Sequence, residues 1–591
     1  NQGDEPYDIE DNQFQTLDNY HSRRNALKMR RGMRRFTGSA AAEALYQLSS
    51  YLDEDDIWTV MFGGATGFHK IDPNNRNQFT AITNLDNINY PTSTVPWSMK
   101  QYNKVMYACR NGVGKLQRIS NAGSQFAGIA APTVAPVITD GGAGGDAVAG
   151  DYTVVYTYVR RDTNGNVINE SNRSPISNVL TLAANREIDV ASLTLDSGIP
   201  PDILVKRMYV SFPNQDGNWY FIEDQPTPGT TADFSSYQSD DLGVAYEDTN
   251  GLPPINPRFL EVFNERLWLT DGKDLYFSED GLPESYDTFN TITIGQRDGF
   301  DITGLKAFNE RLLVGKTNAT YYITGEENAN FQRRTLSDVH GVASHHSMQV
   351  VNGKAYWFGG DNFYASDGNG VEAIGSVEVR DFIDGIAATD YPTVVSCINA
   401  KEETYVCSAI SSGTRKGAAY NYKDGTWNTY SFNGSIGAPR AFCKASDKDD
   451  SPIVYCIPSA DGTRMYEWDT STRDGIYDIT YTFQTKSYAF GSEEELKFLR
   501  FFQILANSVT AGGEFTFTLY RNDTATSLNT ISLEPSYGYQ WKQISLSNAT
   551  NPGTHLSVKV EYVSPGVQMT ISGIGFTYVL TGRSVPRSVG S

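Results

Sequence analysis

One two-strand pattern occurs twice in the sequence at close spacing. FNERLWLTDGKDLYFSEDG begins at Phe263, and FNERLLVGKTNATYYITGE begins at Phe308. Each copy consists of a polar turn, a short apolar strand, a turn rich in Gly, Asp or Asn, and a second strand that ends in Ser or Thr. Since a two-strand unit cannot bury its own apolar faces, such units must stack on one another.

The pattern recurs along most of the chain, and each unit is marked by a polar residue at its first turn. The seven candidate units carry Asp56, Asn103, Asn264, Asn309, Asn352, Glu402 and Asp450. Neighbouring marks lie 43 to 50 residues apart, except for a gap of 161 residues between Asn103 and Asn264. A period of about 45 residues with several short strands per unit is typical of the blades of a β-propeller.

The long gap holds an inserted domain. Subtracting one blade spacing leaves about 115 residues, which is the size of a small β-sandwich. A Pro/Ala/Gly segment at 131–152 precedes alternating strand patterns, and the prolines of 249–259 end them. We predict a fibronectin-III-like β-sandwich at 131–252, between the first blades (51–130) and the remaining blades (253–475).

Beyond residue 475 the 45-residue rhythm stops and evenly spaced strands follow. They predict a C-terminal β-sandwich of jelly-roll or related type at 476–583, followed by a flexible tail at 584–591. The predicted fold class is therefore all-β: a β-propeller of about seven blades with an inserted fibronectin-III-like β-sandwich and a C-terminal β-sandwich.

Residues 1–50 are expected to form an N-terminal arm and a basic hairpin. The basic residues are Arg23, Arg24, Lys28, Arg30, Arg31, Arg34 and Arg35. They form either a phosphate-binding stripe or a hairpin around Gly32 that pairs with acidic neighbours or with a second subunit. The acidic composition of the chain favours the second interpretation. Residues 39–50 predict a helical turn with Ser39 as its cap.

The charge balance excludes a general grip on nucleic acid. The chain has 69 acidic and 48 basic residues, a net charge of −21. Such a surface suits DNA that slides past without binding, because like charges repel. The acidic runs 52–56, 446–450 and 492–495 are expected to be solvated turns, or alternatively to line a channel.

The cysteines and the apolar segments exclude several further classes. Five cysteines without CxxC spacing argue against a disulfide framework and a structural zinc site, and we expect buried, small apolar residues. No apolar run approaches 18 residues, so we expect no membrane-spanning segment. The start lacks the basic and apolar regions of a signal peptide.

No catalytic constellation is visible. HExxH, GxSxG and GxxxxGK[ST] are absent. His345 and His346 are adjacent and would face opposite sides of a strand, so we expect loop or interface residues rather than metal ligands. The stretches 72–78, 162–167 and 366–370 lack the closing Glu of a calcium loop and predict hairpin turns. We predict a non-enzyme with no catalytic, cofactor-binding or metal residues and no cofactor.

Two stretches carry a family resemblance. FNERLWLTDGKDLYFSEDGLPESYDTFNTITIG is followed by DGFDITGLKAFNERLLVGKTNATYYITG, and EPYDIEDNQFQTLDNYHSRRNALKMRRGMRRF opens the chain. The NERL strand, LYFSEDGLPESY, ITGL, YYITG and the basic RRGMRRF element resemble the tail nozzle proteins of short-tailed bacteriophages, the tail tubular protein B type. The resemblance is closest over 260–370, extends over 1–130 and is weak in the insert and the C-terminal sandwich.

The resemblance implies a structural virion protein. It would form a ring of six copies beneath the portal and adaptor rings, retain the packaged DNA and let it pass during ejection. The implied partners are other copies of itself in a homo-hexamer, the phage adaptor, tail fibre or other tail proteins, and genomic DNA without sequence specificity. The implied location is the phage tail of the virion, after synthesis in the host cytoplasm.

A second class of function stays open. YKDGTWNTY (422–430) resembles the Asp-box turn of sialidase-type propellers, although it occurs once and normally has a structural part. The alternative is therefore a receptor- or glycan-binding, or glycan-hydrolysing, β-propeller protein.

Overall fold

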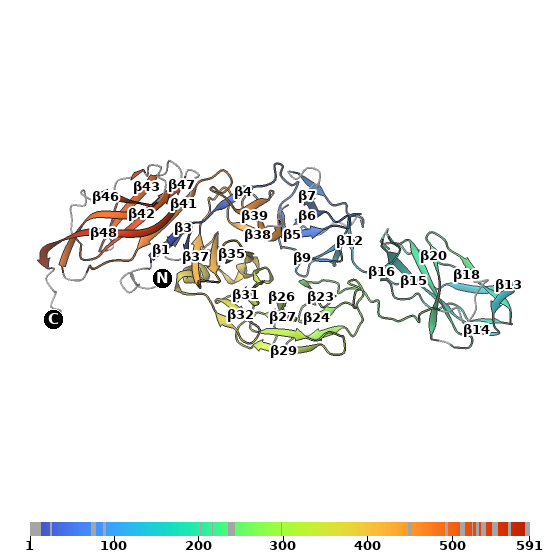
Figure 1. The fold of residues 1–591 in the computed structure, drawn as a ribbon. Helices are drawn as coiled ribbons and strands as arrows, with labels where there is room; N and C mark the ends of the chain where they lie inside the picture. Colours follow the sequence, from blue (N-terminus) through green and yellow to red (C-terminus); the bar gives the residue numbers. More distant parts are fainter. Residues whose placement is uncertain are drawn as a thin grey trace.

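The computed structural model describes residues 14–584, apart from 24–25, 72–77, 87–89, 91, 163, 201, 216, 234–242, 297, 447–451, 491–494, 509–513, 523, 528–530, 533–538, 546–552 and 565–568. Almost all regular structure in this part of the chain is strand, which confirms the all-β class. Figure 1 shows a central propeller with the inserted sandwich at one side and the C-terminal sandwich at the other.

Seven antiparallel blades of four strands each form the propeller; six are separate sheets, and the strands of blade 6 belong to a larger sheet. In the order of the chain, blade 1 consists of β5 (Leu45–Leu52), β6 (Trp58–Gly64), β7 (Phe68–Ile71) and β8 (Phe79–Ala81), and blade 2 of β9 (Ser98–Tyr102), β10 (Val105–Cys109), β11 (Gln117–Ile119) and β12 (Ser124–Phe126). Blade 3 consists of β22 (Leu260–Phe263), β23 (Arg266–Asp271), β24 (Asp274–Phe277) and β25 (Thr291–Thr293). Blade 4 consists of β26 (Ile302–Phe308), β27 (Arg311–Lys316), β28 (Thr320–Thr324) and β29 (Gln332–Ser337).

The remaining blades follow the same plan. They are blade 5, β30 (Gln349–Val351), β31 (Lys354–Phe358), β32 (Phe363–Ser366) and β33 (Glu372–Ala373); blade 6, β34 (Val395–Asn399), β35 (Thr404–Ser411), β36 (Thr414–Asn421) and β37 (Thr426–Tyr430); and blade 7, β38 (Pro439–Ser446), β39 (Pro452–Pro458), β40 (Tyr466–Ser471) and β4 (Gly32–Arg35). The short helices η1 (His345–Ser347), η2 (Val377–Val379), α1 (Arg380–Asp384) and η3 (Ala388–Thr393) precede β30 and β34.

The polar residue that marks each unit lies in the turn between the first two strands of a blade. In blade 4, Asn309 and Glu310 have φ of 44° and 57°, and in blade 3, Asn264 and Glu265 have φ of 46° and 53°. Two successive positive φ values are those of a type I′ hairpin turn, in which Asn is favoured. The side-chain amide of Asn309 also donates to the carbonyl of Gly353 in the corresponding turn of blade 5, 3.1 Å away. The predicted mark at Asp450 lies outside the described residues.

The N-terminal arm closes the propeller. Strand β4 pairs antiparallel with β40 as the outer strand of blade 7, with Gly32 opposite Ser471. Gly32 is required there, because a Cβ would lie 2.1 Å from the carbonyl oxygen of Arg473. The predicted hairpin around Gly32 is therefore wrong: the hairpin is formed by β2 (Tyr20–Arg23) and β3 (Ala26–Met29).

The predicted helical turn at 39–50 is also wrong, because blade 1 begins at Leu45 with strand β5 rather than at residue 51. Leu45, Leu48 and Tyr51 are buried at a spacing of three, as on a helix. The strand produces this spacing because its register shifts between Leu45 and Gln47 and because both of its faces are covered. Leu48 packs toward blade 7, and Tyr51 packs toward blade 2.

The insert consists of two opposed sheets and a short strand pair. One sheet has the order β16 (Val167–Glu170), β15 (Val154–Arg161), β19 (Val205–Ser211), β20 (Trp219–Pro226), the other β13 (Val137–Ala147), β18 (Arg186–Ala191), β21 (Ala232–Asp233), and β14 (Gly150–Tyr152) pairs with β17 (Leu180–Leu182). Buried Tyr156, Tyr158, Ile188 and Val190 lie between the sheets.

A buried carboxylate joins the insert to the propeller. Glu284 of blade 3, 3% exposed, accepts hydrogen bonds from Arg160 Nη1 at 2.6 Å and Asn169 Nδ2 at 3.2 Å, both in the insert. Tyr107 of blade 2 donates its hydroxyl at 3.0 Å, and Arg118 Nε of the same blade lies 3.2 Å away. Burial works to raise the pKa of Glu284, but the two guanidinium groups outweigh it and hold that pKa below its usual range.

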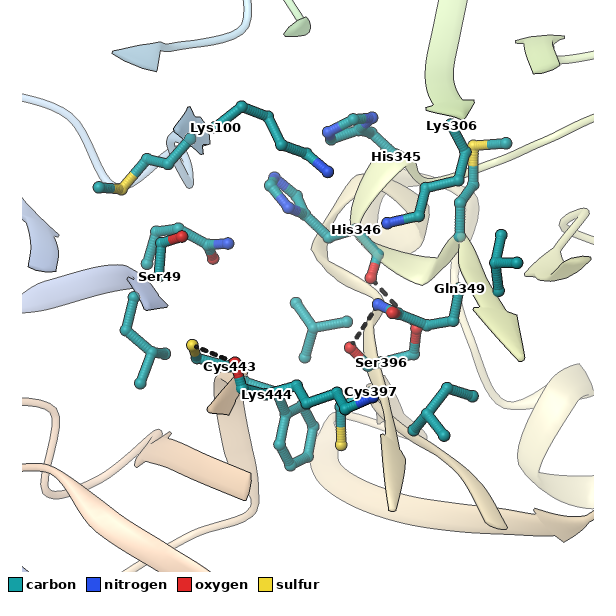
Figure 2. A pocket seen from close by; sticks show the side chains of 18 of the residues that line it. Ser49, Lys100, Lys306, His345, His346, Gln349, Ser396, Cys397, Cys443 and Lys444 are labelled. Atoms are coloured by element: carbon teal, nitrogen blue, oxygen red, sulfur yellow. Dashed lines mark hydrogen bonds between the residues drawn. The ribbon is translucent and has the colours of Figure 1, made fainter. Parts of the chain in front are cut away.

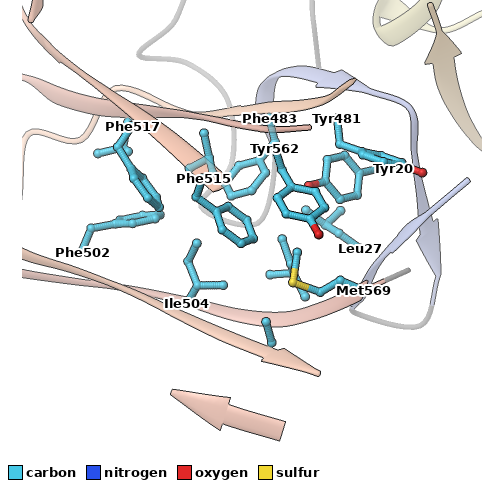
Figure 3. Close-up of a cluster of buried hydrophobic side chains, with 14 of the residues drawn as sticks. Tyr20, Leu27, Tyr481, Phe483, Phe502, Ile504, Phe515, Phe517, Tyr562 and Met569 are labelled. Carbon is cyan, nitrogen blue, oxygen red and sulfur yellow. The ribbon is translucent and has the colours of Figure 1, made fainter. Parts of the chain in front are cut away.

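The C-terminal sandwich shares its sheets with the arm. One sheet has the order β2, β3, β48 (Met569–Ser584), β42 (Glu495–Ser508), β46 (Tyr539–Ser545), and the other β1 (Phe14–Asp18), β41 (Ile479–Thr485), β47 (Leu556–Ser564), β43 (Glu514–Arg521), β44 (Thr524–Ser527), with β45 (Ile531–Ser532) beside β43. Figure 3 shows the aromatic core between them, to which Tyr20 and Leu27 of the arm contribute. Strand β1 also pairs with β37, so the second sheet continues into blade 6.

Ion pairs from buried to exposed fix the arm. Arg30 is 1% exposed and binds Asp474, with Nη2 to Oδ2 at 2.6 Å and Nη1 to Oδ1 at 3.0 Å. Lys28 lies 3.0 Å from Glu402 in the turn between β34 and β35 of blade 6, and Arg34 donates to Glu467 of β40 at 2.6 Å. These three basic residues of the predicted cluster pair with acidic neighbours of the same chain.

Candidate functional site

A cavity of about 260 Å³ lies on the axis of the propeller. Its walls come from the first strand of every blade, for example Ser49 of β5, Ser396 of β34 and Lys444 of β38. Figure 2 shows these side chains converging from different blades. Since the innermost strands of a propeller all face its axis, residues spread over some 400 positions of the sequence meet here.

The wall has a repeating register in four consecutive blades. Lys100, Glu261, Lys306 and Gln349 each stand three positions before the turn Asn of their blade, and all four line the cavity. The type I′ turn fixes how far each first strand extends, and the two-residue period of the strand then fixes which side chains face the axis.

The cavity is cationic although the chain is acidic. Glu261 is the one carboxylate among its lining residues, and Lys100 binds it at 2.7 Å. Lys306 and Lys444 form no ion pair with a described residue. Repulsion from Lys100, with a contribution from burial, lowers the pKa of Lys306 to about 8, although Glu261 works the other way.

The two adjacent histidines lie in η1, outside the strands, in line with the loop position expected for them, and both line the cavity. A 3₁₀ turn advances about 120° per residue instead of the 180° of a strand. The Nδ1 atom of His345 accepts a hydrogen bond from the backbone N–H of Leu305 at 3.2 Å, and its Nε2 lies 3.0 Å from the Ser98 hydroxyl. The proton of His345 is therefore on Nε2.

Both imidazoles are uncharged at neutral pH. Burial lowers the pKa of His345 well below its ordinary value, and His346 and the lysines lower it further. Burial and then Lys306 lower the pKa of His346 to about 4. The described residues contain no group of three or more His, Cys, Asp or Glu side chains placed to hold a metal ion.

The cavity thiols are not activated. Burial raises the pKa of Cys443 to about 12, since its hydrogen bonds to Ser50 offset the burial only in part, and burial raises the pKa of Cys397 well above its ordinary value. All five cysteines are free and buried, as expected from the sequence. The chemistry that the wall offers is therefore charge and hydrogen-bond donation.

The other stretches that we singled out form turns. Asp162 Oδ1 accepts the backbone N–H groups of Asn164 and Asn166, both at 2.8 Å, and Asp367 Oδ1 accepts that of Asn369 at 2.9 Å. Most of 72–78 lies outside the described residues. The Asp-box-like turn leads to buried Trp427, whose indole N–H donates to the Ile374 carbonyl at 2.7 Å, which is a packing role.

The acidic run 52–56 forms the turn between β5 and β6. Asp53 Oδ1 accepts the backbone N–H groups of Asp55 and Ile57, at 3.0 and 2.8 Å, and residues 54–56 are exposed. Residues 447–450 and 492–494 of the other two acidic runs lie outside the described residues. No helix in the described ranges has the length and apolar character needed to cross a membrane.

Comparisons with known proteins give distant structural similarities. No protein-family model matches the chain, and no curated protein matches it. Among solved structures it is similar to the extracellular domain of a hybrid two-component system from B. thetaiotaomicron, at 11% identity over 90% of this chain and 61% of that one, with a TM-score of 0.27. It is also similar to the Dos1 propeller, at 9% identity over 75% of this chain and 96% of that one, with a TM-score of 0.33.

The Neurospora crassa Pan2 WD40 domain is a further similar structure, at 9% identity over 72% of this chain and 89% of that one, with a TM-score of 0.25. The chain spans 61% of the length of the first two structures that it matches. The propeller fold rests on the seven blades described above.

Proposed function

We propose that the chain is a subunit of a short-tailed phage tail nozzle. In this role it forms a ring below the portal and adaptor, retains packaged DNA and provides the conduit for genome ejection. The observation that carries the proposal is the position of the two stretches that resemble the nozzle family. Each stretch forms contacts between the propeller and one of the two sandwiches.

The arm stretch supplies the joint at one side of the propeller. Its strands complete blade 7 and both sheets of the C-terminal sandwich, and Arg30 anchors it through the buried pair with Asp474. The stretch at 260–370 contains Glu284, which joins blades 2 and 3 to the insert. A wall that resists internal pressure needs such stiff joints between domains, since interfaces without them move readily.

Charge supports the same role. Each subunit carries −21, and an acidic wall repels DNA phosphates and lets the duplex slide. Ring closure needs a heterologous interface, in which one face of a subunit meets a different face of the next. The long molecule in Figure 1, with a sandwich on either side of the propeller, offers different faces to its two neighbours.

Electron microscopy and mass photometry of the purified chain test the proposal. We expect closed rings of six copies, alone or after addition of a phage adaptor ring. A monomer that never associates with adaptor or tails would refute it. A glycan array and a glycosidase assay address the alternative function, and a specific signal in either assay would favour that alternative.

A further inference from the structure

The axial cavity holds unbalanced positive charge that the proposed nozzle role does not use. Three lysines line it, and its one carboxylate, Glu261, is bound to Lys100 at 2.7 Å. Neither Lys306 nor Lys444 forms an ion pair with a described residue, although the charge of Glu261 acts on Lys306. Lys100 and Lys306 are both partly buried, and neighbouring cationic side chains that are partly withdrawn from water are costly unless a counter-charge is present.

The lysines approach each other closely. The ammonium group of Lys100 repels that of Lys306, and this repulsion is the main reason why the pKa of Lys306 falls to about 8. Figure 2 shows Lys100, Lys306 and His346 directed toward the same space. An anion placed among them would replace a repulsion with attractions to each group.

We propose that the axial cavity is a binding site for a small inorganic oxyanion of charge −2, such as phosphate or sulfate. Lys306 is its principal ligand, Lys100 and Lys444 contribute further charge, and the neutral imidazole of His346 contributes an N–H group. Charge-assisted hydrogen bonds from ammonium groups are the usual means of holding such ions.

The size of the cavity limits the ligand to this class. A volume of about 260 Å³ lies below the range of roughly 300–1,000 Å³ that accommodates drug-sized ligands. At roughly 30 Å³ for each water molecule, it holds a tetrahedral oxyanion together with several waters. A DNA duplex, whose major groove alone is about 12 Å wide, does not enter.

The affinity of the cavity for the anion should fall as the pH rises. The anion binds the protonated form of Lys306, so its affinity is highest below pH 8 and falls as pH rises through about 8. Both histidines stay neutral above pH 6, because the pKa of His346 is about 4 and that of His345 is far below its ordinary value. Sulfate is the better probe for this series, since its own charge does not change over the range.

Isothermal titration of the full chain with sodium sulfate, against sodium chloride at equal ionic strength, tests the proposal. We expect saturable binding of one sulfate and no comparable signal with chloride. Lys306→Met should weaken binding at least about tenfold, the loss of one charged hydrogen bond. Lys273→Met, which removes an exposed lysine in a blade 3 turn, is the control and should bind as the parent does.

Two further measurements keep the result decisive. Sulfate stabilises proteins non-specifically, so unfolding temperatures are compared between parent and variant, and only the parent should show a saturable rise. If Lys306→Met does not fold, Lys444→Gln and the pH series on the parent take its place. Equal signals for sulfate and chloride, or an affinity that is unchanged from about pH 7 to pH 9, would overturn the proposal.

Discussion

The joint at Glu284 leads to a quantitative prediction. Glu284→Gln preserves the size of the side chain but replaces one carboxylate oxygen with an NH₂ group. Oε2 receives donors from Arg160, Asn169 and the Gly128 backbone, and Oε1 receives the Tyr107 hydroxyl. In either orientation the new NH₂ group would therefore face donors.

The loss of stability in Glu284→Gln comes from the guanidinium groups that no longer face a carboxylate. Removing one partner of a buried ion pair typically costs about 3–5 kcal/mol, because the remaining charge is buried and unpaired. Arg160 keeps a second partner in Asp202, with Nε 2.8 Å from Oδ2, and Asp202 is 27% exposed. We therefore expect about 3 kcal/mol, the lower end of the range. The loss should fall on the attachment of the insert more than on its separate core.

Urea unfolding of the whole chain measures the loss, and limited proteolysis of the 249–259 connection reports whether the insert detaches. Trp219 is the one tryptophan in residues 131–252, so a parallel pair of proteins carrying Trp219→Phe identifies the part of the fluorescence change that belongs to the insert. Asp280→Asn is the matched control, because Asp280 is exposed in the same loop.

The reasoning is refuted if Glu284→Gln and Asp280→Asn unfold within about 0.5 kcal/mol of each other, the usual range for surface substitutions. It is also refuted if the variant is less stable overall but the 249–259 connection is cut no faster than in the parent. That second result would place the cost inside blade 3 rather than at the joint.

Three further predictions rest on other contacts. Arg30→Met should destabilise the chain by about 3–5 kcal/mol, while Arg34→Met, at a 63% exposed side chain, should cost at most about 1 kcal/mol; equal losses in thermal unfolding would contradict the burial argument. Asn309→Val should cost about 1–2 kcal/mol more than Asn309→Gly, because only the second tolerates the positive φ of the turn, and urea midpoints compare the two. Because folding lowers the pKa of Glu284, its ionised carboxylate stabilises the fold at pH values above its ordinary pKa near 4.5, and this stabilisation is lost as the pH falls through the folded pKa. The stability difference between parent and Glu284→Gln should therefore shrink in acid. A constant difference down to about pH 3 would argue against the ion pair.

The blades could be predicted because their signal is local. A type I′ turn needs two residues with positive φ, so Asn followed by Glu, Lys or Gly at 264, 309, 103 and 352 marks each hairpin directly in the sequence. The positions of the insert and of the C-terminal sandwich could be predicted in the same way, because the spacing of about 45 residues between units is interrupted at the insert and ends at the sandwich.

The errors occurred where a residue has two neighbours that are distant in sequence. Leu45, Leu48 and Tyr51 mimic a helix because β5 has a register shift and blade 1 is covered on both faces, and a strand of that kind loses its two-residue alternation. The partner of Gly32 is Ser471, and no local pattern announces a pairing across more than 430 residues.

The cavity was missed for a related reason. Lys100, Glu261, Lys306 and Gln349 share one register position, and aligning the units on the turn Asn would have shown a polar residue there in four consecutive blades. That the position faces the axis, however, becomes meaningful only once seven blades close into a ring. His345 and His346 required, in addition, the 3₁₀ turn that no motif indicated.

Closure by the arm links the folding of the chain to the role proposed for it. Blade 7 is completed only when β4 pairs with β40, and β1 to β3 enter the sandwich built from residues after 478. Both contacts join the N-terminal arm to the C-terminal part of the chain. The entropy cost of bringing these distant segments together is therefore met once, and it is shared by the closure of the propeller and the assembly of the C-terminal sandwich. Pulling the sandwich away from the propeller must therefore break strand pairings and the buried Arg30–Asp474 pair at the same time. A flexible linker would give way one contact at a time, whereas this arrangement resists separation cooperatively, which is the property that a pressurised conduit requires.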